Sequence, residues 1–279
     1  MNKKTFKHLS TPYLVWLYVL AVVPVVIMFA LMFIRTEGVT IDEETSFTLS
    51  NFAILVEQST IVAFYNSFKF GILTTLICIV LGYFVAYRIY KSHFGNKFLI
   101  LTILILPMWS NMLLRTEALG NIMEPNNIIS NLLSRIGIDI SVNIKGTDFA
   151  VLAGLVFNYM PFMILPIYTA LEKIDPSVEE AALDLGVTEV RKFWKVVYPL
   201  SSKGIITGSI MVFLPSLSGF AIPEILGKGN IFMLGNLIQQ KFVQMEYYYG
   251  AILAIIILIL ILGSLVIISR VDKEAETLL

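Results

Sequence analysis

Apolar residues gather in six stretches that contain no Asp, Glu, Lys or Arg, at residues 14–34, 70–87, 98–114, 149–171, 204–223 and 247–269. A helix needs about 20 apolar residues to cross a bilayer, and each stretch meets or approaches that length. Within lipid a segment must satisfy its own backbone polar groups, so each stretch predicts a helix. The pattern therefore predicts an all-α membrane protein with six transmembrane helices, forming one domain over residues 1–279.

Two of these stretches need comment. The third is the shortest and contains Pro107, Ser110 and Asn111, so we expect a kink there or a helix that extends beyond these limits. The first exceeds the apolar core of a signal peptide, and no clear small-residue cleavage site follows it. We interpret it as a membrane span.

The distribution of basic residues predicts the orientation of the chain. With the N-terminus inside, the inner segments hold Lys3, Lys4, Lys7, Arg88, Lys91, Lys97, Lys173, Arg191, Lys192, Lys195, Lys203, Arg270 and Lys273. The outer segments hold Arg35, Lys69, Arg115, Arg135, Lys145, Lys228 and Lys241. The excess of basic residues on the inner side predicts a multi-pass plasma-membrane protein with both termini in the cytoplasm.

Composition and motifs argue against an enzyme. The chain is 57% hydrophobic and 14% charged with no net charge, which gives no reason to expect a nucleic-acid partner. It has one cysteine, two distant histidines and no GxxxxGK[ST] loop, so we expect no catalytic, metal or nucleotide site. Energy for transport would come from a partner or an ion gradient. The six stretches carry no charge, which weakens the reading as an ion-coupled secondary transporter.

The inner segment 172–203 is the one long inner loop, and it reads as two short helices. Asp175 is a good N-cap and Pro176 suits the first helical position. Gly186 is a natural C-terminal stop, and a second helix runs from Glu189 until Pro199 ends it. The pattern fits an ordinary amphipathic connector at the lipid interface, and it equally fits a docking element for a cytoplasmic protein.

The loop also resembles a known motif. Glu180-Ala181-Ala182, three residues, Gly186, nine residues, Val196, one residue and Tyr198-Pro199 resemble the EAA loop of permease subunits in ABC importers. The family has Ile where this chain has Val196 and Leu where it has Tyr198. The resemblance implies that Glu180, Ala181, Ala182, Gly186 and Pro199 couple the permease to an ATPase, with Glu180 in direct contact.

Further segments narrow the resemblance to spermidine/putrescine permeases. They are residues 155–168 with 171–175, residues 213–220 and residues 234–242, which occur in order along the chain. The chain is most similar to the first, B-type permease of that importer. One departure follows the third stretch, where Arg115-Thr116-Glu117-Ala118-Leu119 replaces the usual Arg-Thr-Tyr-Ala-Trp.

The resemblance implies the fold of a type I ABC importer permease in the bacterial inner membrane. It also implies three kinds of partner: a second related permease, two copies of a cytoplasmic ATPase, and an extracytoplasmic binding protein that delivers polyamine. ATP and magnesium would bind to the ATPase, and no cofactor is expected in this chain. Other readings stay open: a permease for another small solute such as iron, thiamine or phosphonates, an ion-coupled carrier or channel subunit, and a non-transporting scaffold.

A polyamine pathway needs acidic groups, carbonyls and aromatic faces. The outer segments hold the acids Glu37, Asp42, Glu43, Glu44, Glu57, Glu117, Glu124, Asp139, Asp148, Glu224 and Glu246. Glu117, Glu124 and Glu224 follow the third and fifth stretches, which border the pathway in related importers. We take these three acids as pathway candidates, with Tyr159 and Phe220 as weaker aromatic ones, although an exposed loop charge is the simpler explanation for each acid.

Overall fold

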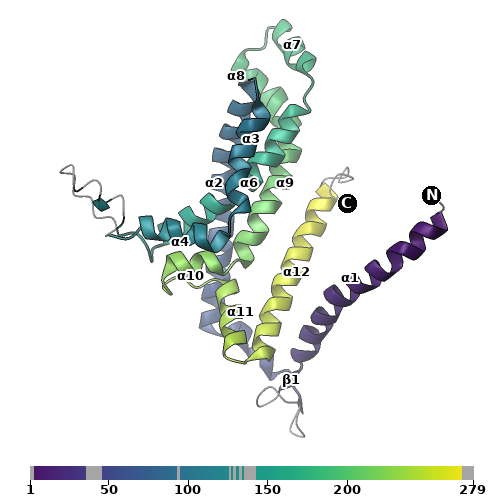
Figure 1. The fold of residues 1–279 in the computed structure, drawn as a ribbon, viewed down its shortest axis with the longest axis vertical. Coiled ribbons are helices and arrows are strands. Elements are labelled where there is room, and N and C mark those ends of the chain that lie inside the picture. The colour runs from purple at the N-terminus through teal and green to yellow at the C-terminus, as the bar shows by residue number, and fades with distance from the viewer. Residues whose placement is uncertain are drawn as a thin grey trace. The chain divides into compact units, whose positions relative to one another are not determined.

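The computed structural model describes residues 3–35, 46–92, 95–125, 127, 130–131, 134 and 143–271. Its elements (Figure 1) are α1 (Lys3–Leu31), β1 (Ile34–Arg35), β2 (Ser46–Phe47), η1 (Ser50–Val56), α2 (Gln58–Lys91), α3 (Lys97–Ile105), η2 (Leu106–Trp109), α4 (Met112–Ile122), α6 (Asp148–Glu172), α7 (Pro176–Asp184), α8 (Glu189–Lys192), η3 (Phe193–Val197), α9 (Tyr198–Ser218), α10 (Ala221–Gly227), α11 (Leu234–Val243) and α12 (Tyr247–Val271). They form two compact units, one from residues 1–61 with 237–263 and one from residues 62–236 with 264–279. The single permease domain expected from the sequence stays a prediction.

Within the described residues, five helices are long and apolar enough to cross a membrane: α1, α2, α6, the continuous helix Glu189–Ser218, and α12. The bent pair α3–η2 and α4 adds a sixth span if it is counted as one. The predicted all-α architecture with six transmembrane helices is therefore the observed one. The helices generally extend past the charge-free stretches, because polar residues can continue a helix beyond the apolar part.

The larger unit is a bundle in which α2, α3, α6 and α9 run alongside one another (Figure 1). The short helices α7 and α8 lie at one end of this bundle, and α4 and α10 lie at the other. Its core contains fully buried side chains from α2 and α6, among them Phe70, Leu155, Met163, Ile167 and Leu171. Helix α6 is the central element, since its buried residues recur along its whole length.

Two glycines let α9 pack directly on the backbone of α6. A Cβ atom built at Gly204 would lie 2.5 Å from the Pro166 carbonyl oxygen and 2.7 Å from Ala170 Cβ. One turn further along α9, a Cβ at Gly208 would lie 2.7 Å from Met163 Sδ. Gly204 and Gly208 have the GxxxG spacing, in which small residues let two helix backbones approach closely within the membrane.

The third span is broken rather than kinked within one helix. Segments 99–109 and 112–122 meet at an angle of 92°. Ser110 Oγ donates to the Pro107 carbonyl oxygen at 2.7 Å, and the Asn111 side chain accepts from the backbone N–H of Leu113 at 2.8 Å. The polar residues that marked this stretch as unusual therefore end one helix and start the next, and the second helix runs beyond the predicted limit to Ile122.

An arginine fastens this elbow to α6. The Arg115 guanidinium donates to the Pro107 carbonyl oxygen through Nη1 and to Asn158 Oδ1 through Nε, the latter at 2.8 Å. Asn158 is buried on α6 and donates to the Gly154 carbonyl oxygen at 2.9 Å and to Thr116 Oγ1 at 3.3 Å. The bend is therefore fixed by side chains of α4 and α6 as well as by the local backbone.

The fifth span also differs from its predicted limits of 204 and 223. We placed its start after Lys203 because that residue is charged, but Lys203 lies inside α9, which begins at Tyr198. The helix ends at Ser218, because Gly219 takes an extended conformation. A Cβ at Gly219 would lie 2.8 Å from the Pro215 carbonyl oxygen, so glycine suits this break. Pro223, the predicted end, belongs to the separate helix α10.

The smaller unit contains α1, a two-residue hairpin and most of α12. Ile34 pairs with Phe47 in the antiparallel ladder of β1 and β2, and the rings of Phe33 and Phe47 stack with centroids 5.5 Å apart. Asn51 is buried and donates to the carbonyl oxygens of Met32 and Ile34 at 3.2 and 3.1 Å. This side chain satisfies the backbone where α1 gives way to the hairpin.

The α6–α9 contact predicts a strong effect of a single methyl group. We expect Gly204→Ala to lower the thermal stability of the purified protein, because overpacking a close contact costs about 1–3 kcal/mol. Gly263→Ala is the matched control, since a Cβ there meets nothing within 4 Å and alanine favours a helix. Melting in detergent, followed by size-exclusion chromatography, measures both. Equal melting temperatures would show that the two helices do not pack this closely.

Candidate functional site

Helix α7 begins at a well-defined cap. The Asp175 carboxylate accepts from the backbone N–H of Ser177 at 2.9 Å, and this hydrogen bond holds the pKa of the carboxyl below its usual value. Pro176 occupies the first helical position, as the sequence predicted. Asp175 is therefore confirmed as the N-cap of α7.

Gly186 ends α7 with positive φ. Its φ is +77°, its N–H donates to the Leu183 carbonyl oxygen at 2.8 Å, and the Val187 N–H donates to the Ala182 carbonyl oxygen at 3.2 Å. These two bonds form a Schellman motif, which reverses the chain and satisfies the last carbonyls of the helix. The predicted role of Gly186 as a left-handed stop is confirmed.

The remaining residues of the EAA pattern divide between two faces of α7. Glu180 and Ala181 are exposed, whereas Ala182 is buried. Leu185 is 84% exposed and Val190 on α8 is 69% exposed, so the α7–α8 hairpin also carries large exposed apolar side chains. We call Glu180, Ala181, Leu185 and Val190 the tip surface. Exposed apolar groups and an exposed acid on one short hairpin suit a protein partner.

Pro199 does not end the second helix, which corrects the sequence prediction. Helix α8 continues through a π-helical turn, Phe193–Val197, directly into α9, and Pro199 lies in the first turn of α9. A proline lacks the N–H and crowds the carbonyl four residues earlier. The wider π turn precedes it and accommodates this defect. The loop therefore runs into the fifth span without a break.

Aromatic rings surround this π turn. Phe193 packs edge-on against Tyr83 and Tyr87 of α2, with ring centroids 5.6 and 5.1 Å apart, and Tyr198 lies 5.7 Å from Tyr83. The Tyr83 hydroxyl and Ser201 Oγ are 2.8 Å apart. Tyr198, which departs from the family pattern, thus packs at the junction of α2 and α9.

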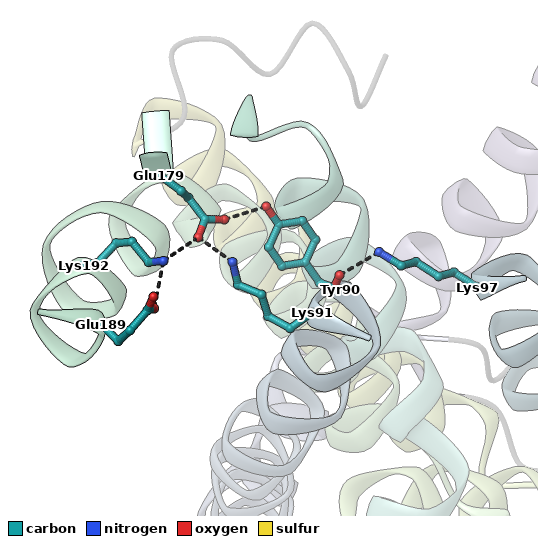
Figure 2. A network of polar contacts seen from close by, with 6 residues as sticks. All are labelled: Tyr90, Lys91, Lys97, Glu179, Glu189 and Lys192. Atoms are coloured by element: carbon teal, nitrogen blue, oxygen red, sulfur yellow. Dashed lines mark hydrogen bonds and ion pairs between the residues drawn. The ribbon is translucent and has the colours of Figure 1, made fainter. Parts of the chain in front are cut away.

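A buried ionic cluster holds the α7–α8 hairpin on the end of α2 (Figure 2). Glu179 accepts from the Tyr90 hydroxyl at 2.7 Å and from Lys91 Nζ at 2.5 Å. Lys192 Nζ lies 3.3 Å from the same carboxylate and 2.8 Å from that of Glu189. The side chains of Glu179 and Lys192 are only 7% and 4% exposed. Sequence reasoning missed this cluster, because only the fold brings α2 next to α7.

The cluster keeps Glu179 ionised. Burial by itself raises the pKa of the Glu179 carboxyl, but hydrogen bonds from Lys91, Tyr90 and Lys192 outweigh it, so the pKa lies below its ordinary value of 4.5. A carboxyl with a lowered pKa stabilises the fold above the unfolded value, and this stabilisation is lost as the pH falls through the lower folded value. Glu179 is therefore ionised at neutral pH.

At the α4 and α10 end, two of the predicted pathway acids meet lysines. Lys145 Nζ lies 3.1 Å from Glu124 and 3.7 Å from Glu117, and Lys228 Nζ lies 3.1 Å from Glu124. Hydrogen bonds from Lys228 and Lys145 lower the pKa of Glu124. The Lys145 side chain is only 8% exposed. Glu124 therefore joins the segment before α6 to the segment after α10, and Glu117 lies at the margin of this cluster.

The other pathway candidates lie apart from that cluster. Glu224 is exposed on α10, and among the described residues it has no ion-pair partner. Tyr159 is buried on α6, and its hydroxyl donates to the Pro215 carbonyl oxygen at 3.4 Å. Phe220 is 45% exposed at the start of α10, and its carbonyl oxygen accepts from Asn236 at 2.9 Å. Tyr159 thus ties α6 to α9, while Glu224 and Phe220 are accessible.

The structure also places several of the other outer acids. Asp148 is paired with Lys69, Glu246 lies 2.6 Å from Lys241, and Glu57 accepts from Ser59 Oγ at 3.4 Å. Within the part of the chain that is described, no group of three or more His, Cys, Asp or Glu is placed to hold a metal ion. Outside the described residues lie Glu37, Asp42, Glu43, Glu44, Asp139, Arg135, Lys273 and His93.

A long groove runs along α6 and α9 toward α7. Its volume is about 1000 Å³, and it is lined mainly by apolar side chains, including Met108, Phe162 and Met211. Lys173 and Lys203 line it as well, together with Asp175 from the N-cap of α7. Met108 of the third span and residues of α9 therefore line the same cavity.

The chain matches the family described as "Binding-protein-dependent transport system inner membrane component" over residues 79–274. This range includes the α7–α8 hairpin, the groove and the ionic cluster. The chain belongs to this family. It is thus an ABC transporter permease, a multi-pass membrane subunit.

Similar proteins support this assignment. The permease is 30% identical to the spermidine/putrescine transport system permease protein PotB of Haemophilus influenzae over 260 residues, covering 92% of this chain and 91% of the relative. It is 31% identical to PotB of Escherichia coli K12, covering 87% and 90% of the two chains. A crystal structure of a bacterial alginate ABC transporter, in complex with an alginate pentasaccharide-bound periplasmic protein, matches with a TM-score of 0.77 at 15% identity, covering 98% and 95%. The fold is that of type I ABC importer permeases.

The Schellman turn predicts a specific response to substitution. We expect Gly186→Val to loosen the α7–α8 hairpin, because a left-handed conformation costs an L-residue about 1–2 kcal/mol and a branched side chain more. Gly186→Asn is the matched control, since asparagine tolerates this region. Nothing lies within 4 Å of a Cβ at this position, so the substitutions cause no steric clash and test the backbone conformation alone. Limited proteolysis of the hairpin in membrane vesicles measures the effect, and equal cleavage of the two variants would contradict it.

Proposed function

We propose that this permease forms half of the transmembrane pathway of an ATP-driven polyamine importer. The observation that carries the proposal is the 30–31% identity to spermidine/putrescine permeases over nearly the whole chain, combined with an exposed hairpin tip of the EAA type. A second related permease would supply the other half. The groove along α6 and α9, bordered by Met108 of the third span, would face the pathway or that second permease.

The tip surface would dock on a cytoplasmic ATPase. Glu180 is exposed, so its carboxylate is available for charge-assisted hydrogen bonds to a basic partner. Ala181 lets a partner approach closely, and Ala182 packs inward. The ATPase would bind ATP and magnesium, and this chain would need no cofactor. Gly186 would set the angle of the hairpin, and Pro199 would lie where the hairpin joins α9.

The orientation follows from this docking. The α7–α8 end would face the cytoplasm, as would both termini, and the α4 and α10 end would face outward. An extracytoplasmic binding protein would then deliver polyamine at that outer end. This placement agrees with the excess of Lys and Arg in the segments assigned to the inner side.

Purification from native membranes tests the assembly. We expect the tagged chain to bring down a related permease and an ATPase in a 1:1:2 complex, and the complex in liposomes to import spermidine or putrescine only with ATP and the binding protein present. Glu180→Ala should weaken ATPase binding while α7 stays folded, whereas Asp184→Ala, also exposed on α7, should not. Transport by this chain alone without ATP would overturn the proposal.

Charge removal at the outer end tests the polyamine path. We expect Glu117→Gln and Glu224→Gln to raise the apparent KM for polyamine uptake by up to about fivefold each, the effect of an exposed charge pair worth ~1 kcal/mol. Glu57→Gln is the control, since this acid is also exposed and precedes α2. Uptake is measured at saturating binding protein, with ATP hydrolysis followed in parallel. Wild-type kinetics in both neutral variants would remove these acids from the path.

A further inference from the structure

We propose that Glu179, the neighbour of the family's Glu180, is the positioning residue that transmits movement of α7 to the membrane helices. The proposal rests on the proposed function, since it assumes that an ATPase moves the tip surface. Successive residues of a helix point about 100° apart. Glu180 therefore faces outward, while Glu179 is buried against the end of α2.

The Glu179 carboxylate is the point at which separate elements meet (Figure 2). Its Oε1 accepts from the Tyr90 hydroxyl of α2. Its Oε2 accepts from Lys91 Nζ, also of α2, and lies 3.3 Å from Lys192 Nζ of α8. Removing the Glu179 side chain would therefore remove both of these hydrogen bonds between α7 and α2.

The network continues beyond α2. Lys97 Nζ, at the start of α3, donates to the Tyr90 carbonyl oxygen at 2.7 Å. Helix α3 leads directly to the elbow at Pro107, which Arg115 and Asn158 fasten to α6. A displacement of α7 would thus reach both the second and the third span through a chain of short polar contacts.

Neither lysine needs Glu179 for its own charge. Lys192 has a second partner in Glu189 at 2.8 Å. The Lys91 side chain is 38% exposed, so its ammonium group is not sealed in the interior with Glu179. Simple neutralisation of a buried cation therefore does not account for the position of Glu179. A buried carboxylate that joins three elements specifies one arrangement of them, a role that buried ionic groups take in some proteins.

The test compares Glu179→Gln with Glu180→Gln, two isosteric changes at adjacent positions. Spin labels at Asp184→Cys on α7 and Phe84→Cys on α2, in a Cys78→Ala background, report the distance between the two helices. ATPase binding, ATP hydrolysis and polyamine uptake are measured on unlabelled complexes. We expect Glu179→Gln to broaden the distance distribution and to lower uptake per ATP hydrolysed at least about fivefold, with ATPase binding retained. Glu180→Gln should weaken ATPase binding with the distance unchanged.

Two further variants keep the proposal falsifiable. Lys91→Met removes one donor, leaves the Glu179–Lys192 pair in place, and should act in the same direction as Glu179→Gln; Arg88→Met, exposed in the same last turn of α2, is its control. If Glu179→Gln fails to reach the membrane, the distance distribution and the uptake per ATP of Lys91→Met test the positioning role instead. The double variant Glu179→Leu/Lys192→Leu removes both buried charges. Restored uptake per ATP in that variant would overturn the proposal, because Glu179 would then merely neutralise Lys192.

The outcomes separate this inference from the proposed function. If the wild-type chain binds no ATPase, the proposed function fails, while the spin-label distances still report whether Glu179 holds α7 on α2. If the ATPase binds and drives uptake, but Glu179→Gln and Lys91→Met keep both a narrow distance distribution and wild-type uptake per ATP, the positioning role is wrong and the proposed function stands.

Discussion

The direct backbone contact between α6 and α9 fixes the two ends of the α7–α8 hairpin. Inside a bilayer no hydrophobic force drives helices together, so close packing of small residues has to supply the attraction. Gly204 and Gly208 provide it against Met163, Pro166 and Ala170. Because α6 leads into α7 and α8 leads without a break into α9, the hairpin inherits its position from this pair of helices. The groove beside them depends on the same contact.

The two chain ends attach the hairpin at two points only, and it could still rotate about the line that joins them. A third point of attachment is needed to fix its position. The ionic cluster on α2 supplies this third point at the cost of burying charge. Breaking a buried ion pair is far more harmful than its net contribution to stability suggests, because the remaining charge stays buried without a partner. The cluster thus strongly favours one position of α7. Because the Glu179 carboxylate accepts from two residues of α2, a movement of α7 would carry α2 with it.

Features set by local chemistry were predictable, and features set by distant contacts were not. The Asp175 cap and the Gly186 turn follow from residues within one turn, and the spans follow from apolar length. Glu179 is an acid in the first turn of α7, and nothing in the sequence places α2 beside it. The helix continues through Pro199 because a π turn precedes that residue, and no local signal announces such a turn. Glu124 and Lys145 are far apart along the chain, and nothing in the sequence indicates that they form an ion pair.

The ion pairs at the α4 and α10 end limit how this end could attract a cation. Glu117 and Glu124 face Lys145 and Lys228, so the four charges cancel and give no net attraction for a polycation. A mouth without net charge holds a polyamine only through groups that distinguish its spaced ammonium ions, such as carbonyl oxygens, aromatic faces and single unpaired carboxylates. Glu224 on α10 is exposed and has no ion-pair partner among the described residues, so it is a carboxylate of this kind. Delivery by a binding protein would relieve the mouth of capturing the cation from solution, and weak binding there would favour onward passage of the polyamine rather than its retention.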